Sequence, residues 1–211
     1  MQLEIKIIGK VLTLSILVTS CLNAQEMKPE LVGGPCEGCE AVLEFGDRSL
    51  TPVDTLPDFK KNGTPIRVQG TVYENDGRTP AEGVIIYVYH TNQQGRYAPE
   101  KDSRDWGKRH GYIRGWVKTD SQGKYTYYTL KPGAYPSGTE PAHIHYTILE
   151  PNGKYYWLQS CHFSGDPLLT DEERTPESPR GGTSGLLNLQ KGDGLMVGTR
   201  NIILGRNIPG Y

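Results

Sequence analysis

The sequence lacks the features that mark several large classes of proteins. Its 211 residues carry a formal net charge of only −1, and no stripe of basic residues is interleaved with aromatic ones. A nucleic-acid or other polyanionic partner is therefore not indicated. No internal repeat is visible, and the length suits one well-buried domain rather than two of ordinary size.

Cysteines are few, with four in the chain. Cys36 and Cys39 form a Cys-x-x-Cys pair, and no second pair is present to complete a zinc site. In an oxidising compartment such a pair forms a small disulfide, which is our prediction. Cys161 stands alone on an expected strand and is predicted to be a buried, unpaired thiol.

The apolar run at residues 11–18 is too short for a transmembrane helix. It ends in Val18-Thr19-Ser20-Cys21, which resembles the lipobox of bacterial lipoproteins. Residues 1–20 are therefore predicted to be a lipoprotein signal peptide, with lipid attached to Cys21. Ordinary cleavage near Ala24 is the alternative. Both interpretations predict an exported protein, and the first also predicts a membrane anchor at the periplasmic or cell surface.

Phenylalanine is scarce too, with three residues against thirteen tyrosines. Tyrosine suits half-buried strand faces, and 26 glycines and 15 prolines supply turns. Alternating or continuous apolar residues predict strands at residues 66–73, 84–89, 123–130, 142–149, 155–163 and 196–204. The only predicted helix is a turn at residues 170–174, capped by Thr170 or Asp171. This pattern predicts an all-β fold, a prealbumin-like β-sandwich with little helix, over residues 65–211.

Residues 21–64 differ in composition from the rest of the chain. They are rich in glycine, proline and acidic residues and contain two short apolar patches. We expect an extended N-terminal arm that wraps the sandwich or makes a contact in a homo-oligomer, rather than a unit that folds alone.

A pair of histidines is the most informative feature of the sequence. His143 and His145 lie two residues apart on a predicted strand, so their side chains point to the same face. Tyr135 precedes them on a loop with proline and glycine, and Tyr97 follows another strand. Imidazoles with phenolates, and no carboxylate or thiolate, suit a high-valent iron better than zinc, calcium or magnesium. Taken singly, these residues could equally be surface histidines and packed loop aromatics.

Residues 66–211 resemble the intradiol ring-cleavage dioxygenases. The matching segments follow the order of that family and comprise residues 83–97, 114–120 with 123–125, 130–136, 141–145, 163–168 and 200–205. The segment Pro141-Ala-His-Ile-His145 after a Tyr-Pro loop is the most specific of them. The resemblance implies one non-haem Fe(III) held by Tyr97, Tyr135, His143 and His145. It also implies cleavage of a catechol-type ring by O2 to a muconate, during which the catechol displaces Tyr135.

One position departs from the family pattern. Many members have an arginine directly before the Pro-Ala-His-Ile-His segment, and this chain has Glu140. A carboxylate beside the substrate should repel an acidic catechol, so turnover of such substrates is expected to be poor. Arg114 is a candidate to supply the missing positive charge in catalysis and substrate binding, and its alternative is a surface salt bridge near Asp120.

The remaining histidines are assigned from their context. His110 lies in the basic segment Lys108-Arg109-His110, which is expected to be a solvated face, with a place at the mouth of the substrate site as the alternative. His90 is expected to be packed in a strand, and His162 lies outside every matching segment. A prealbumin-like binding module without a redox metal is the alternative to the enzyme interpretation.

Overall fold

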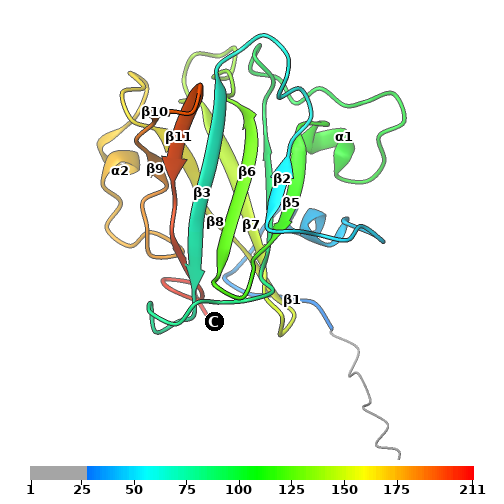
Figure 1. Ribbon diagram of the computed structural model, residues 1–211, viewed down its shortest axis with the longest axis vertical. Coiled ribbons are helices and arrows are strands. Elements are labelled where there is room, and N and C mark those ends of the chain that lie inside the picture. Colours follow the sequence, from blue (N-terminus) through cyan, green and yellow to red (C-terminus); the bar gives the residue numbers. More distant parts are fainter. Residues whose placement is uncertain (1–27) are drawn as a thin grey trace, which may run out of the picture.

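Two β-sheets, packed face to face, form the body of the chain (Figure 1). The computed structural model describes residues 28–211. The first sheet contains β1 (Glu30–Leu31), β4 (Ile85–His90), β5 (Arg114–Lys118), β7 (His143–Leu149), β8 (Lys154–Phe163) and β9 (Leu186–Leu187). The second contains β2 (Val53–Thr55), β3 (Pro65–Tyr73), β6 (Lys124–Leu130), β10 (Gln190–Gly192), β11 (Leu195–Thr199) and β12 (Ile202–Ile203). The prediction of an all-β sandwich is confirmed.

Helices are short in the described part of the chain. They are the 3-10 helix η1 (Cys39–Leu43) and the α-helices α1 (Gly107–His110) and α2 (Asp171–Arg174). None of them is long and apolar enough to cross a membrane. The predicted signal peptide and the lipidation site at Cys21 lie outside the described residues.

The central strands of the first sheet carry the apolar core. The order of this sheet is β1-β8-β7-β4-β5, with β9 beside β8, and β7 pairs antiparallel with both β4 and β8. Ile86 and Val88 of β4 pack into the core between the sheets, whereas Ile85 and Tyr87 belong to a second apolar cluster. Both faces of β4 are therefore covered, which explains its almost continuous apolar sequence.

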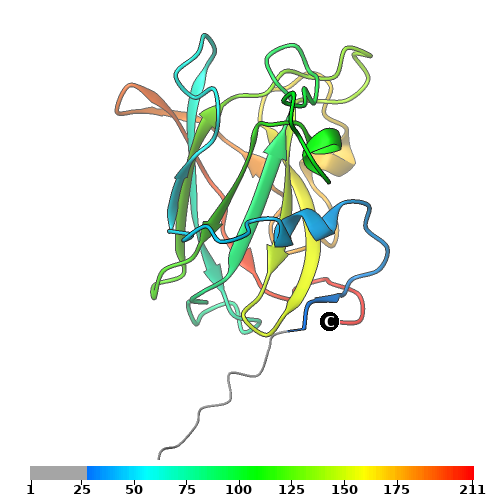
Figure 2. The same cartoon turned by 90° about the vertical axis from the view of Figure 1, so that its right-hand side faces the viewer.

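The N-terminal arm covers the outer face of the first sheet. β1 pairs with β8 in parallel, and Ala41 and Val42 of η1 are fully buried in the second apolar cluster. The indole N–H of Trp116 lies 3.2 Å from the carbonyl oxygens of both residues. Figure 2 shows the arm and α1 on the same side of the sandwich. The arm thus wraps its own sandwich, the first of the two alternatives expected for it.

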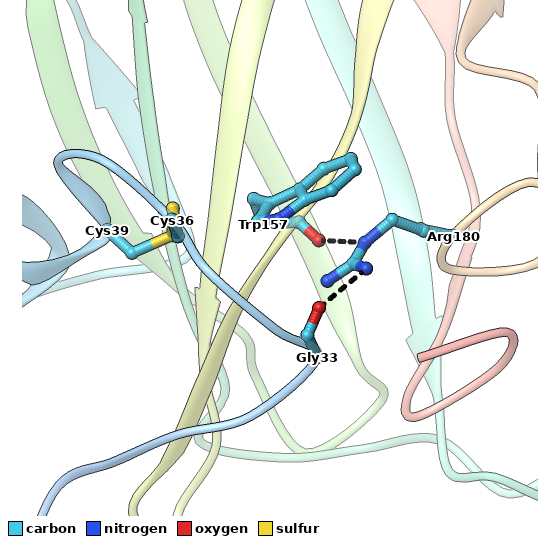
Figure 3. The surroundings of a disulfide bond; sticks show 5 residues. All are labelled: Gly33, Cys36, Cys39, Trp157 and Arg180. Carbon is cyan, nitrogen blue, oxygen red and sulfur yellow. Dashed lines mark hydrogen bonds between the residues drawn. A yellow bond between two sulfur atoms is a disulfide. The ribbon is translucent and has the colours of Figure 1, made fainter. Parts of the chain in front are cut away.

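A disulfide and a buried arginine fix the first part of the arm. Cys36 and Cys39 are bonded, as predicted (Figure 3). Arg180 donates from Nη1 to the carbonyl oxygen of Gly33 at 3.0 Å and from Nε to that of Trp157 at 2.9 Å. Its guanidinium also lies 3.6 Å from the centre of the Trp157 ring. The arm is therefore joined to β8 by backbone pairing and by this arginine.

Most predicted elements are present, and the differences have local causes. The helical turn at residues 170–174 is α2, and Thr170 caps it in a reciprocal capping box with Glu173. The strand predicted at residues 196–204 is divided into β11 and β12, both parallel to β3. The chain passes so close to Gly70 that a Cβ there would lie 1.7 Å from the carbonyl oxygen of Arg200. The pairing is interrupted at that close approach.

Candidate metal centre

Strand β7 presents His143 and His145 on the face turned away from the core. Ile144, between them, is fully buried in the core that separates the sheets. Alternation along the strand therefore places both imidazoles on the opposite face, which the arm partly covers. The two Nε2 atoms lie 3.0 Å apart.

Two loops bring tyrosines to these histidines. Tyr97 lies on the loop after β4, and Tyr135 on the loop after β6. The loops touch at Gly95, where an added Cβ would lie 1.9 Å from the carbonyl oxygen of Ala134. Gly95 also has φ +70°, which favours glycine. The close contact of the loops holds the two tyrosines side by side.

The structure brings all four predicted ligand residues together. The Tyr97 hydroxyl lies 2.8 Å from the Tyr135 hydroxyl and 2.8 Å from Nε2 of His145. The Tyr135 hydroxyl lies 3.3 Å from Nε2 of His143. Two phenol oxygens and two imidazole nitrogens thus converge on one point. We call these four residues the Tyr/His cluster.

Hydrogen bonds behind the cluster orient the imidazoles. Nδ1 of His143 lies 2.8 Å from the carbonyl oxygen of Pro141, which can only accept, so Nδ1 carries the proton. The lone pair of Nε2 therefore points into the cluster, as a metal ligand requires. Nδ1 of His145 lies 3.3 Å from the Ser160 hydroxyl.

Burial sets the protonation of the cluster. It raises the pKa of both Tyr97 and Tyr135, and the charge of Glu140 adds to the rise at each. Burial and the neighbouring His143 lower the pKa of His145 well below its usual value. The imidazole is therefore neutral and able to coordinate, whereas the phenols need a strong cation to lose their protons. This donor set fits a hard, highly charged metal ion.

No competing metal site is present among residues 28–211. That part of the chain contains no group of three or more His, Cys, Asp or Glu side chains placed to hold a metal ion. The Tyr/His cluster has only two histidines and depends on its tyrosines for the other donors.

An aromatic wall continues from the cluster to α1. Tyr89 stacks on His145 with ring centres 4.4 Å apart and on His110 with ring centres 3.8 Å apart. His110 in turn stacks on Trp106, and its Nδ1 lies 2.9 Å from the Tyr87 hydroxyl. His110 is therefore buried in the wall of a cavity, and the expectation that it belongs to a solvated face was wrong. The cavity, of about 340 Å³, opens on Tyr97, Tyr135 and His145.

Glu140 lines a neighbouring cavity. This cavity, of about 540 Å³, also reaches His143 and His145. Glu140 lies directly before Pro141 in an exposed segment of the loop after Tyr135. Its carboxylate is thus beside the cluster, where the sequence analysis placed it, but in contact with solvent, which weakens its field.

Arg114 is not part of the site. Its Nη1 lies 2.5 Å from Oε2 of Glu44 on the arm, and its guanidinium lies 5.2 Å from the centre of the Trp116 ring. It lines neither cavity beside the Tyr/His cluster. This position corrects the roles in catalysis and substrate binding predicted for Arg114. Its salt-bridge partner is Glu44, and not Asp120 as the alternative expected. Arg114 instead joins β5 to the arm.

His90 and His162 lie in different environments. His90 is buried as expected, and its Nε2 lies 2.7 Å from the Thr129 hydroxyl. His162 lies across the strand pair from His143, with ring centres 5.8 Å apart, and lies 3.5 Å from Glu173. His143 and His162 both line the larger cavity. No motif in the sequence connects His143 with His162, although the hairpin of β7 and β8 places the two opposite each other.

Fold and cluster together define a class: a β-sandwich with two tyrosines and two histidines gathered at one point. A family model described as Dioxygenase matches residues 44–177. The chain belongs to the intradiol ring-cleavage dioxygenase family.

Two curated relatives extend this assignment. The chain is 32% identical over 154 residues to the protocatechuate 3,4-dioxygenase beta chain of Burkholderia cepacia, covering 64% of each protein. It is 28% identical over 163 residues to catechol 1,2-dioxygenase 1 of Acinetobacter lwoffii, covering 68% of this chain and 49% of the relative. The chain thus spans between about half and two thirds of the length of these relatives.

Solved structures support the fold. The dioxygenase domain of a dioxygenase–carbohydrate-binding protein fusion from Streptomyces sp. SirexAA-E superposes with a TM-score of 0.55 at 21% identity, covering 83% of this chain and 98% of that one. An intradiol ring-cleavage dioxygenase from Tetranychus urticae gives a TM-score of 0.53 at 20% identity, covering 84% and 93%.

Proposed function

We propose that this chain is an Fe(III)-dependent intradiol dioxygenase that uses O2 to cleave a catechol-type ring to a muconate. The observation that carries the proposal is the convergence of Tyr97, Tyr135, His143 and His145 within 2.8–3.3 Å of their neighbours in the cluster. A binding module without a metal gives no reason for this arrangement. Family membership and the two curated relatives support the same chemistry.

The charges of the donor set agree with iron in this oxidation state. Two tyrosinates and one hydroxide would balance the charge of Fe(III), and one tyrosinate with a catecholate dianion would balance it equally. The net charge of a half-buried site is then the same before and after the substrate binds, which avoids a large desolvation cost. When bound, the iron would withdraw electron density from the catechol ring and make it reactive toward O2.

The two tyrosines have different roles in this proposal. Tyr97 contacts both Tyr135 and His145, so it is held from two sides. Tyr135 is followed by an exposed segment, residues 136–140, and contacts His143 more loosely at 3.3 Å. We therefore infer that Tyr97 would hold the metal throughout, and that the phenolate of Tyr135 would accept a proton from the substrate.

Iron loading and colour test the proposal. Purified protein should bind about one iron per chain and be reddish, because a phenolate bound to Fe(III) absorbs visible light. Tyr97→Phe should lose most of that colour and of the O2 uptake with catechol. The matched control is Tyr128→Phe. Tyr128 lies on β6, away from the cluster, and packs against Phe59. A colourless protein that prefers zinc to iron would contradict the proposal.

We also propose that the chain is exported and anchored to a membrane by lipid on Cys21. The support is the segment Val18-Thr19-Ser20-Cys21 after a short apolar run, together with the disulfide between Cys36 and Cys39. Disulfides persist mainly in oxidising compartments outside the cytoplasm. Lipidation with two or more acyl chains anchors a protein stably.

A further inference from the structure

An ion pair borders the smaller cavity, which opens on the Tyr/His cluster. Of the described residues that line this cavity of about 340 Å³, Arg109 of α1 and Glu37 of the arm carry charged side chains. Nη1 of Arg109 and Oε1 of Glu37 form an ion pair. The other lining residues are aromatic. The volume is within the range of small-molecule sites.

The ion pair can open at little cost. The side chains of Arg109 and Glu37 are 63% and 68% exposed, and pairs so exposed contribute little stability. Arg109 is placed independently of Glu37, because α1 carries it and its guanidinium lies 5.7 Å from the centre of the Trp106 ring. If Glu37 moved away, the guanidinium would still border the cavity with free donors.

The charges that line the two cavities differ: of the described residues, the larger cavity has the carboxylates of Glu37, Glu140 and Glu173 and no lysine or arginine, whereas the smaller one has Arg109 paired with Glu37. Glu140 lines the larger cavity and not this one, whereas Arg109 lines this one and not the larger cavity. A ring substituent with negative charge would be repelled on the Glu140 side, and on the other side it would be attracted to Arg109 once it had displaced the Glu37 carboxylate. The expectation that acidic catechols are poor substrates was drawn from Glu140 alone and did not include the positive charge of Arg109.

We propose that Arg109 determines substrate specificity by binding an anionic ring substituent, such as a carboxylate, which replaces Glu37 as its partner. This proposal rests on the proposed ring-cleavage function, whose substrate class it narrows. The guanidinium can hold a carboxylate through two parallel hydrogen bonds, whereas Glu37 contacts it through Nη1 and Oε1. The ring would lie between the cluster and α1, against Tyr89 and Trp106.

The test measures binding rather than turnover. Iron-loaded protein is titrated with catechol and with 3,4-dihydroxybenzoate, and quenching of tryptophan fluorescence reports binding because Trp106 lines the cavity. Arg109→Gln should weaken binding of 3,4-dihydroxybenzoate about tenfold relative to catechol, and Glu37→Gln should strengthen it severalfold. The matched control is Lys108→Gln, which removes the same charge from an exposed neighbour that does not line the cavity.

The outcomes separate this inference from the proposed function. Equal weakening of both ligands by Arg109→Gln, or the same effect from Lys108→Gln, would overturn the inference even if catechol is cleaved. Selective weakening in a protein that cleaves no catechol would support the anion site and refute the ring-cleavage proposal instead.

Discussion

Replacing Gly38 with alanine should distort the wall between the arm and α1. Gly38 has φ +88°, and a Cβ there would lie 2.5 Å from Nε2 of His110 and 3.2 Å from the Trp106 ring. His110 has little room to yield, since it is only 6% exposed and stacks between Trp106 and Tyr89. The added methyl group must therefore displace the imidazole or the disulfide-closed loop.

The cost has two parts that a control variant can separate. Gly34 has φ +89° and nothing within 4 Å of its added Cβ. Gly34→Ala should thus cost only the backbone strain of a left-handed alanine, about 1–2 kcal/mol. Gly38→Ala should cost about 2 kcal/mol more, because His110 would lose its contact with the Tyr87 hydroxyl and its stacking.

Chemical denaturation of both variants measures this difference. Thermal unfolding is an independent check, because for a chain of this size a loss of 1 kcal/mol lowers the melting temperature by about 2–4 °C. Gly38→Ala should also reduce kcat/KM for a catechol, because the cavity would change shape, whereas Gly34→Ala should not. Equal destabilisation by both substitutions would show that His110 is not held against the arm, and the account of this wall would be refuted.

Three further outcomes are expected. Glu140→Arg should raise turnover of 3,4-dihydroxybenzoate relative to catechol by less than about tenfold, because the Glu140 carboxylate is exposed and solvent weakens its repulsion of the substrate; an unchanged ratio would mean that Glu140 does not act on the substrate. Burial lowers the pKa of His90 to about 4, so below pH 6.5 the unfolded chain takes up a proton that the folded chain excludes. His90 should therefore contribute about 3 kcal/mol to the fall in the free energy of unfolding between pH 6.5 and 4, and the lowered pKa values of His110, His145 and His162 add to that fall. In denaturant titrations, His90→Gln should reduce the fall by the His90 contribution and leave the rest. Cys21→Ala protein should fail to partition with membranes, and equal partitioning of variant and wild type would rule out the lipid anchor.

The sequence was sufficient for the parts of the site that depend on local geometry. A strand period of two places His143 and His145 on one face whatever the rest of the fold does. The order of the matching segments then placed Tyr97 and Tyr135 near them. Likewise, Thr170 and Glu173 form a capping box over three residues, which sequence alone can indicate.

The parts that were missed depend on contacts between distant segments. Arg109 sits in a basic segment that is indistinguishable from a solvated face until Glu37, more than seventy residues earlier, is placed beside it. Arg114 was assigned to the substrate because its partner Glu44 lies on an arm whose path no local pattern reveals. The spacing of charged residues along the sequence does not show which residues they pair with. The partners of Arg109 and Arg114 therefore became visible only in the tertiary structure.

The arm is therefore part of the site and not only a cover for an apolar face. Burial of Ala41 and Val42 fixes η1 on the first sheet, and the disulfide between Cys36 and Cys39 closes the loop that precedes it. Glu37 and Gly38 lie within that loop, one paired with Arg109 and the other against His110. Because the same short loop supplies both contacts, packing of the arm determines the charge and the shape of the cavity together. Removing the disulfide should then change ligand selectivity even where the sandwich remains folded.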